Sequence, residues 1–145
     1  MGYVVEEDIV KKFSKKVVVL EIISLVSWIF IILYQFLFGL VFLIFGYGLA
    51  MIIAGIWNIV ACVKTIKNIN YFNSITTMGQ VEGVANFYRT NRTSTIIFMI
   101  LNFIFGGFLG GFASLYDLII GIILENEAQK LVSENQVIVT NNYNA

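Results

Sequence analysis

The chain of 145 residues contains no histidine, no proline and a single cysteine, Cys62. These absences remove most of the side chains from which metal sites, catalytic nucleophiles and disulfide bridges are built. The sequence also has no pair of carboxylates at catalytic spacing and no cluster of metal-ligating residues. We therefore expect no enzymatic activity, no bound cofactor and no metal ion.

Charged residues are scarce as well, at 12% of the chain, whereas 59% of the residues are hydrophobic and the mean hydropathy is +0.86. An ordinary soluble domain has about 45–50% apolar and about 25% charged residues. A water-soluble fold of this composition would expose large apolar patches. The sequence therefore predicts an integral membrane protein in a lipid bilayer. Nine basic residues balance nine acidic ones, so no net charge attracts nucleic acid and we expect no such partner.

Residues 17–63 form one apolar run whose only formal charge is Glu21. A single helix of this length would be about 70 Å long, more than twice the thickness of the hydrocarbon core of a bilayer. The run is therefore predicted to be a first transmembrane hairpin, with spans near 17–38 and 41–63. The reversal is expected between Gly39 and Gly48, because glycine accommodates the backbone of a tight turn.

Residues 94–124 are also apolar and allow two interpretations. One long span over about 95–116 would leave Asp117 at the far interface. A second hairpin would instead turn within residues 106–111, where four glycines in six positions disfavour a continuous helix by roughly 3–4 kcal/mol relative to alanine.

An internal similarity favours the second hairpin. Ser27–Gly39 and Ser94–Gly106 share the serine, an isoleucine, two phenylalanines and the final glycine, and Gln35 aligns with Asn102. Polar positions match in addition to apolar ones, which predicts two tandem units. The predicted fold class is thus all-α: a polytopic membrane protein that forms a four-helix bundle of two tandem hairpins, with three spans as the alternative.

Basic residues flank the predicted spans and mark the cytoplasmic side of a membrane protein. We therefore expect residues 1–16 to form a cytoplasmic amphipathic segment on the membrane surface and residues 64–93 a cytoplasmic, partly helical loop. Residues 125–145 are predicted to be a polar tail, disordered from residue 136 onward. The expected location is the cell membrane, with the N-terminus in the cytoplasm. The basic residues concerned are Lys11, Lys12, Lys15, Lys16, Lys64, Lys67, Arg89 and Arg92.

Five polar side chains inside the apolar runs are candidate intramembrane sites. A carboxylate in hydrocarbon costs a few kcal/mol, which invites a role in binding a proton or cation. The alternative for Glu21 is contact with the headgroups or with Lys15 and Lys16, and the alternative for Asp117 is an interhelical hydrogen bond, as the protonated acid or with an amide partner, Asn58 or Asn102. The amides should face other helices, because an unsatisfied amide in lipid is costly. The five candidates are Asp117, Glu21, Asn58, Asn102 and Gln35.

Small residues recur at helical spacing and are candidate helix-packing positions. Small side chains four residues apart let two helix backbones approach closely in a membrane. The neighbouring helix belongs either to this chain or to another one. The candidate positions are Gly46, Ala50, Ala54, Gly107, Gly110 and Gly111.

Two functions compete. The first is a structural or accessory subunit of a membrane assembly, which binds a membrane-protein partner or a further copy of itself. The second is an oligomeric small transporter or channel that uses Asp117 or Glu21. The size, the four expected spans and the acid in the first span resemble the small multidrug resistance exporters. The residues after Glu21 lack the glycine and lysine of that family's motif, so no residue role is transferred.

Overall fold

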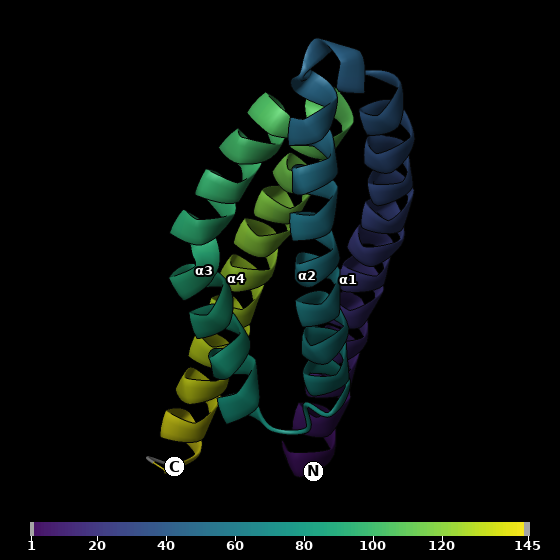
Figure 1. Cartoon of the computed structure of the whole chain (residues 1–145). Helices are drawn as coiled ribbons and strands as arrows, with labels where there is room; N and C mark the ends of the chain where they lie inside the picture. Colours follow the sequence, from purple (N-terminus) through teal and green to yellow (C-terminus); the bar gives the residue numbers. More distant parts are fainter. Residues whose placement is uncertain (1, 144–145) are drawn as a thin grey trace.

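The computed structural model describes residues 2–143, and side chains within residues 6–138, so residues 1, 144 and 145 of the predicted terminal segments lie outside the described residues. The described chain is helical almost throughout, which confirms the predicted all-α class. Its helices form two antiparallel hairpins, α1 with α2 and α3 with α4 (Figure 1). The elements are α1 (Gly2–Val41), the 3-10 turn η1 (Leu43–Phe45), α2 (Tyr47–Asn73), α3 (Met78–Phe105) and α4 (Gly107–Tyr143).

The first hairpin turns between α1 and α2, within the predicted region. Gly46 has a φ of 74°, in the left-handed region that glycine adopts without steric cost. Gly48 is needed for a different reason. A Cβ atom at this position would clash with the carbonyl oxygen of Gly39 and with the backbone of Phe42 and Leu43. The missing side chain therefore lets the ends of the two helices touch.

The second hairpin turns at the glycine-rich stretch, so the alternative of one span through this stretch is wrong. Gly107 has a φ of 76°, and the backbone N–H of Gly106 donates to the carbonyl oxygen of Asn102 at 2.9 Å, which closes the end of α3. Gly110 and Gly111 do not belong to the turn, because they lie within α4. The reversal returns the chain to the end of the bundle at which it starts (Figure 1).

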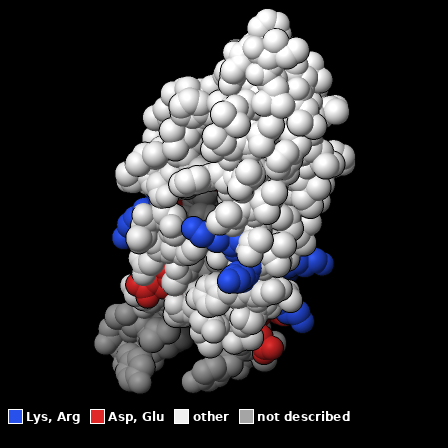
Figure 2. All heavy atoms as spheres, viewed as in Figure 1, with Lys and Arg blue, Asp and Glu red and all other residues white. Residues whose placement is uncertain are grey.

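Apolar and charged residues occupy opposite halves of the bundle. The two hairpin turns lie in what we call the apolar half, and the chain ends and the α2–α3 turn lie in the charged half (Figure 1). Charged side chains gather in the lower half of the face that Figure 2 shows. Among the described helices, α1, α2 and α4 are long and apolar enough to cross a membrane, whereas α3 is apolar only from residue 94 to residue 105. The chain is a small helical membrane protein.

The charged half has an apolar core of its own, to which all four helices contribute. The apolar stripes predicted within residues 1–16 and 64–93 pack in this core. The N-terminal segment continues into the first span as one helix, as expected, but from residue 10 onward its apolar face packs in the bundle and not on a membrane surface. The buried residues are Val10, Phe13, Val17, Phe72, Ile75, Met78, Val81, Val84, Ala85, Leu124 and Ala128.

Helix continues through most of the segment that was predicted to be a partly helical loop, and through the predicted tail. Residues 64–73 extend α2, and α3 begins after a short turn, where Thr77 and Gln80 form a reciprocal capping box. The polar tail extends α4 to Tyr143, so the disorder expected from residue 136 is wrong over residues 136–143. The tail gains this order because α4 is anchored in the core of the charged half through Leu124 and Ala128.

Candidate functional site

Three of the predicted polar residues meet inside the apolar half. Gln35 of α1, Asn58 of α2 and Asn102 of α3 are each at most 3% exposed. The side-chain nitrogen of Asn58 donates to Oε1 of Gln35 at 2.9 Å and to Oδ1 of Asn102 at 3.0 Å. Because each amide belongs to a different helix, this amide cluster joins the two hairpins, and its members face protein and not lipid.

Glycines of the second turn make room for the amide cluster. Nε2 of Gln35 donates to the carbonyl oxygen of Gly106 at 3.1 Å. A Cβ atom at Gly106 would lie 2.6 Å from both Gln35 Nε2 and Asn102 Oδ1, and one at Gly110 would lie 3.1 Å from the same two atoms. A larger residue at either glycine would therefore collide with the side chains of the amide cluster.

One hydrogen-bond acceptor of the amide cluster has no donor among the described residues. The Oδ1 atom of Asn58 is buried and has no hydrogen-bond partner among the described residues, although the nitrogen of the same amide donates twice. A buried carbonyl without a donor costs about 1–3 kcal/mol.

The predicted helix-packing residues divide into two groups. Gly107, Gly110 and Gly111 have neighbours inside the chain, whereas a Cβ atom at Gly46 would meet no atom within 4 Å, so Gly46 serves the turn and not helix packing. Gly111 leaves space that the ring of Phe103 occupies, and a Cβ atom at Gly107 would lie 3.8 Å from Tyr34 and Met51. Ala50 and Ala54 instead line an opening between α2 and α3.

The two carboxylates find partners that differ from the predicted ones. Glu21, which is 8% exposed, accepts a hydrogen bond from the hydroxyl of Tyr88. Asp117 accepts hydrogen bonds from the hydroxyl of Ser24 and from Nε1 of Trp28, the latter at 2.7 Å. The alternative for Glu21, contact with the headgroups or with Lys15 and Lys16, is wrong, because its side chain is buried and bonds to Tyr88 of α3.

The interhelical hydrogen bond predicted as one alternative for Asp117 is confirmed, but the amide partners predicted for it are wrong. Its side chain faces α1 at Ser24 and Trp28, whereas Asn58 bonds to Asn102 and to Gln35, which lies seven residues after Trp28 along α1. Lys16, a predicted partner of Glu21, instead forms an ion pair with Glu127 of α4. Sequence reasoning thus located the acids but assigned their partners incorrectly.

Tyr88, Ser24 and Trp28 were missed as site residues, and two of them left a signal. Glu21, Ser24 and Trp28 are spaced by three and four residues, which places them on one face of α1. Gln35 follows seven residues after Trp28 on the same face. This polar and aromatic stripe faces the second hairpin in the structure. Tyr88 left no such signal, because it lies in a segment predicted to be a loop.

Asp117 lies between two cavities. The smaller one, of about 130 Å³, is also lined by Glu21, Tyr88 and Arg92 and is called the acid cavity below. The larger one, of about 560 Å³, extends between α2 and α3 and is also lined by Lys64. Lys64 lines the larger cavity and Arg92 the smaller one, so Asp117 lies near the level at which the charged half begins. Among the charged residues it is the nearest in sequence to either hairpin turn, ten residues after Gly107.

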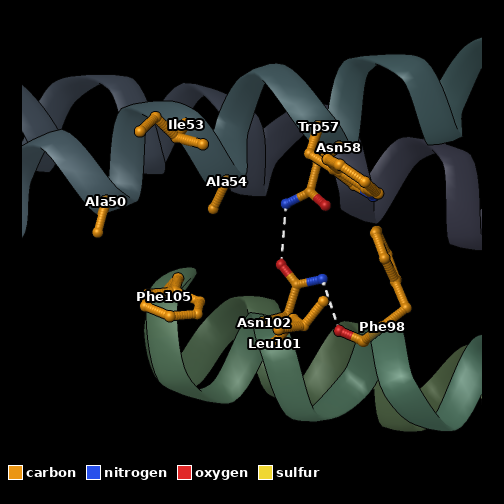
Figure 3. A pocket seen from close by; sticks show the side chains of 9 residues that line it. All are labelled: Ala50, Ile53, Ala54, Trp57, Asn58, Phe98, Leu101, Asn102 and Phe105. Carbon is orange, nitrogen blue, oxygen red and sulfur yellow. Dashed lines mark hydrogen bonds between the residues drawn. The ribbon is translucent and has the colours of Figure 1, made fainter.

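The α2–α3 groove, which runs along α2 from Ala50 to Lys64, contains this large cavity and a second one of about 310 Å³ further into the apolar half. The two cavities share Trp57, Phe98 and Leu101. Figure 3 shows the second cavity, with Ala50 and Ala54 on α2 facing α3 across it and the amides bridging the two helices. The groove stays open because the hairpins pack together mainly through α1 and α4.

The groove, the amide cluster and the acid cavity are thus continuous features of one small helical membrane protein. Their residues supply hydrogen-bond donors, acceptors and both signs of charge along a path of apolar walls. Comparisons of the chain with known protein families, with curated proteins and with solved structures find no match.

Proposed function

We propose that this protein is a non-enzymatic accessory subunit that binds a transmembrane helix of a partner protein over the mouth of the α2–α3 groove. The observation that carries the proposal is the small-residue wall of Ala50 and Ala54. These residues lie one helical turn apart and line an opening, whereas the predicted packing glycines of α4 are occupied within the chain. Close approach at small residues is a main source of helix association in lipid.

The rim of the groove supports the same proposal. Ile53 and Trp57 line the cavity and are 56% and 62% exposed. The large side chains of Ile53 and Trp57 project toward a neighbouring helix, and the small alanines beside them leave space for its side chains. A partner helix would therefore bury apolar surface of its own and of α2, and the four helices of the bundle would not have to separate.

The charged half is proposed to lie in the cytoplasm and the apolar half in the cell membrane. Basic residues concentrate where the charged half meets the apolar half, and such residues remain on the cytoplasmic side during insertion. Lys15, Lys16, Lys64 and Arg92 are among them. Labelling of Gly79→Cys in the α2–α3 turn region by a membrane-impermeant thiol reagent, in a Cys62→Ser background, should then occur only in opened cells.

Replacement of Ala54 by leucine is expected to abolish recovery of the partner, because the larger side chain protrudes at the mouth of the groove, over which the partner helix packs. A tagged chain is extracted from native membranes in mild detergent, and membrane proteins recovered in constant ratio to it are quantified. The matched control is Ile56→Phe, which enlarges a side chain that is 53% exposed and lines neither cavity of the groove. Recovery of the same partner with Ala54→Leu would contradict the proposal.

A second candidate function, an oligomeric transporter or channel, is favoured by the position of Asp117 between the acid cavity and the α2–α3 groove. A titratable group between two cavities is a common element of proton and cation pathways. The accessory proposal predicts that the parent chain, reconstituted in liposomes, conducts no more protons than protein-free liposomes do under an imposed pH gradient. A proton flux that Asp117→Asn lowers tenfold or more, and that Glu127→Gln leaves unchanged, would establish transport instead.

A further inference from the structure

The α2–α3 groove contains one buried polar atom without a partner among the described residues, the side-chain oxygen of Asn58. Asn58 is 1% exposed, and its Oδ1 atom accepts no hydrogen bond from any described residue. In Figure 3 this oxygen points away from Ala54, toward the side of Trp57 and Phe98, where the two cavities of the groove meet. Hydrocarbon cannot satisfy a carbonyl oxygen, so a molecule that binds here and satisfies this atom needs an O–H or N–H donor at this level.

The dimensions of the groove favour a narrow occupant. Its cavities, of about 310 Å³ and 560 Å³, lie in the range of small-molecule sites, about 300–1,000 Å³. A helix with side chains is about 10–12 Å wide, so a partner helix covers the mouth of the groove but does not enter between α2 and α3. A single hydrocarbon chain is narrow enough to enter, and Ile53, Ala54 and Phe105 give the cavity in the apolar half apolar walls.

Charges of both signs border the other end of the groove. Lys64 lies six residues after Asn58, about 9 Å along α2, and forms no ion pair within the described part of the chain. Asp117 lines the same cavity from α4. Its oxygens already accept from Ser24 and Trp28, but a carboxylate has about four acceptor sites, so an ammonium group can still approach. Together the two residues match a head group that carries both charges.

We infer that the α2–α3 groove binds a single-chain zwitterionic lipid with a free hydroxyl between head and tail, as in a lysophosphatidylethanolamine. The tail lies in the apolar cavity and the hydroxyl donates to Oδ1 of Asn58. The phosphate lies near Lys64 and the ammonium near Asp117. This inference goes beyond the proposed function, because the lipid occupies the depth of the groove and the partner helix its mouth.

Trp57 provides a direct reporter, because it lines both cavities of the groove. Lysophosphatidylethanolamine with a brominated acyl chain is added to the purified full chain in detergent, and tryptophan fluorescence is recorded. We expect saturable quenching that disappears in Trp57→Phe. An otherwise identical lipid with a methoxy group in place of the hydroxyl should bind at least tenfold more weakly, because it has no donor for Asn58.

Two lysine variants test the head-group position. Lys64→Gln should weaken binding of the brominated lipid severalfold, whereas Lys67→Gln should not, because Lys67 lines no cavity of the groove. Equal affinity for the hydroxyl and methoxy lipids, or for a brominated diacyl phospholipid, would overturn the inference and indicate ordinary annular lipid. Absence of saturable quenching would overturn it as well. None of these results affects recovery of a partner protein, so the lipid inference and the proposed function fail separately.

Discussion

Replacement of Gly48 by alanine is expected to destabilise the protein by about 3 kcal/mol, at the upper end of the usual cost of overpacking. The added Cβ atom would clash with backbone atoms of Gly39, Phe42 and Leu43, and backbone in a tight turn cannot move aside as a flexible side chain does. The first hairpin would have to open at its turn. The loss is measured as a shift in the SDS concentration that unfolds the purified protein, followed by circular dichroism.

The control for this prediction is Gly79→Ala. Gly79 lies in the first turn of α3, and a Cβ atom there would meet no other atom within 4 Å. Alanine favours helix by about 1 kcal/mol relative to glycine, so this variant should be as stable as the parent or slightly more stable. Equal effects of the two substitutions would show that the close contact at Gly48 is not needed.

Replacement of Asn58 by leucine is expected to cost about 2–6 kcal/mol of stability, because it leaves two buried acceptors without their donor. These acceptors are Oε1 of Gln35 and Oδ1 of Asn102, and both lie in the interior of the apolar half. The same SDS titration measures the loss. Asn73→Leu, at an exposed position at the end of α2, should change stability by no more than about 0.5 kcal/mol.

A triple variant separates the cost of unsatisfied amides from the value of the amide cluster itself. With Gln35, Asn58 and Asn102 all replaced by leucine, no side-chain acceptor of the cluster remains unsatisfied. Removal of all partners of a buried polar group costs less than removal of one. The triple variant should therefore be more stable than Asn58→Leu alone. If the triple variant is less stable than Asn58→Leu, this expectation is wrong, and the hydrogen bonds that remain in Asn58→Leu make a net contribution to the free energy of unfolding.

The positions of the turns could be predicted because they depend on local properties of the chain. Gly46 and Gly107 adopt positive φ angles inside the two regions where glycines interrupt apolar sequence. The length of the apolar run after residue 17 also requires a reversal, whatever the neighbouring helices do. By contrast, the disorder expected for residues 136–143 was based on composition alone and is wrong. A helix that is anchored upstream in a core can continue into polar sequence, as α4 does.

The candidate polar residues could also be found without the structure, but their partners could not. Gln35, Asn58 and Asn102 stand out because amides are rare in apolar runs, yet their mutual contact depends on how each helix is rotated about its axis. The same holds for Asp117, which turns toward Ser24 and Trp28 of α1 and not toward the amides. Successive residues of a helix are separated by a rotation of about 100° about its axis. A modest change in the rotation of one helix therefore changes which side chains of the neighbouring helices it contacts.

Composition and the spacing of apolar and glycine residues thus determined by themselves that this is a helical membrane protein whose first apolar run reverses as a hairpin, because bilayer thickness and backbone sterics act on the chain locally. The sequence favoured a second hairpin but left one long span open, and the structure decided for the hairpin. Only the tertiary structure decided that the hairpins pack through α1 and α4, that the amide cluster leaves Oδ1 of Asn58 unsatisfied, and that a groove opens beside it. These features arise from the relative rotation and tilt of whole helices, which depend on contacts between residues far apart in sequence.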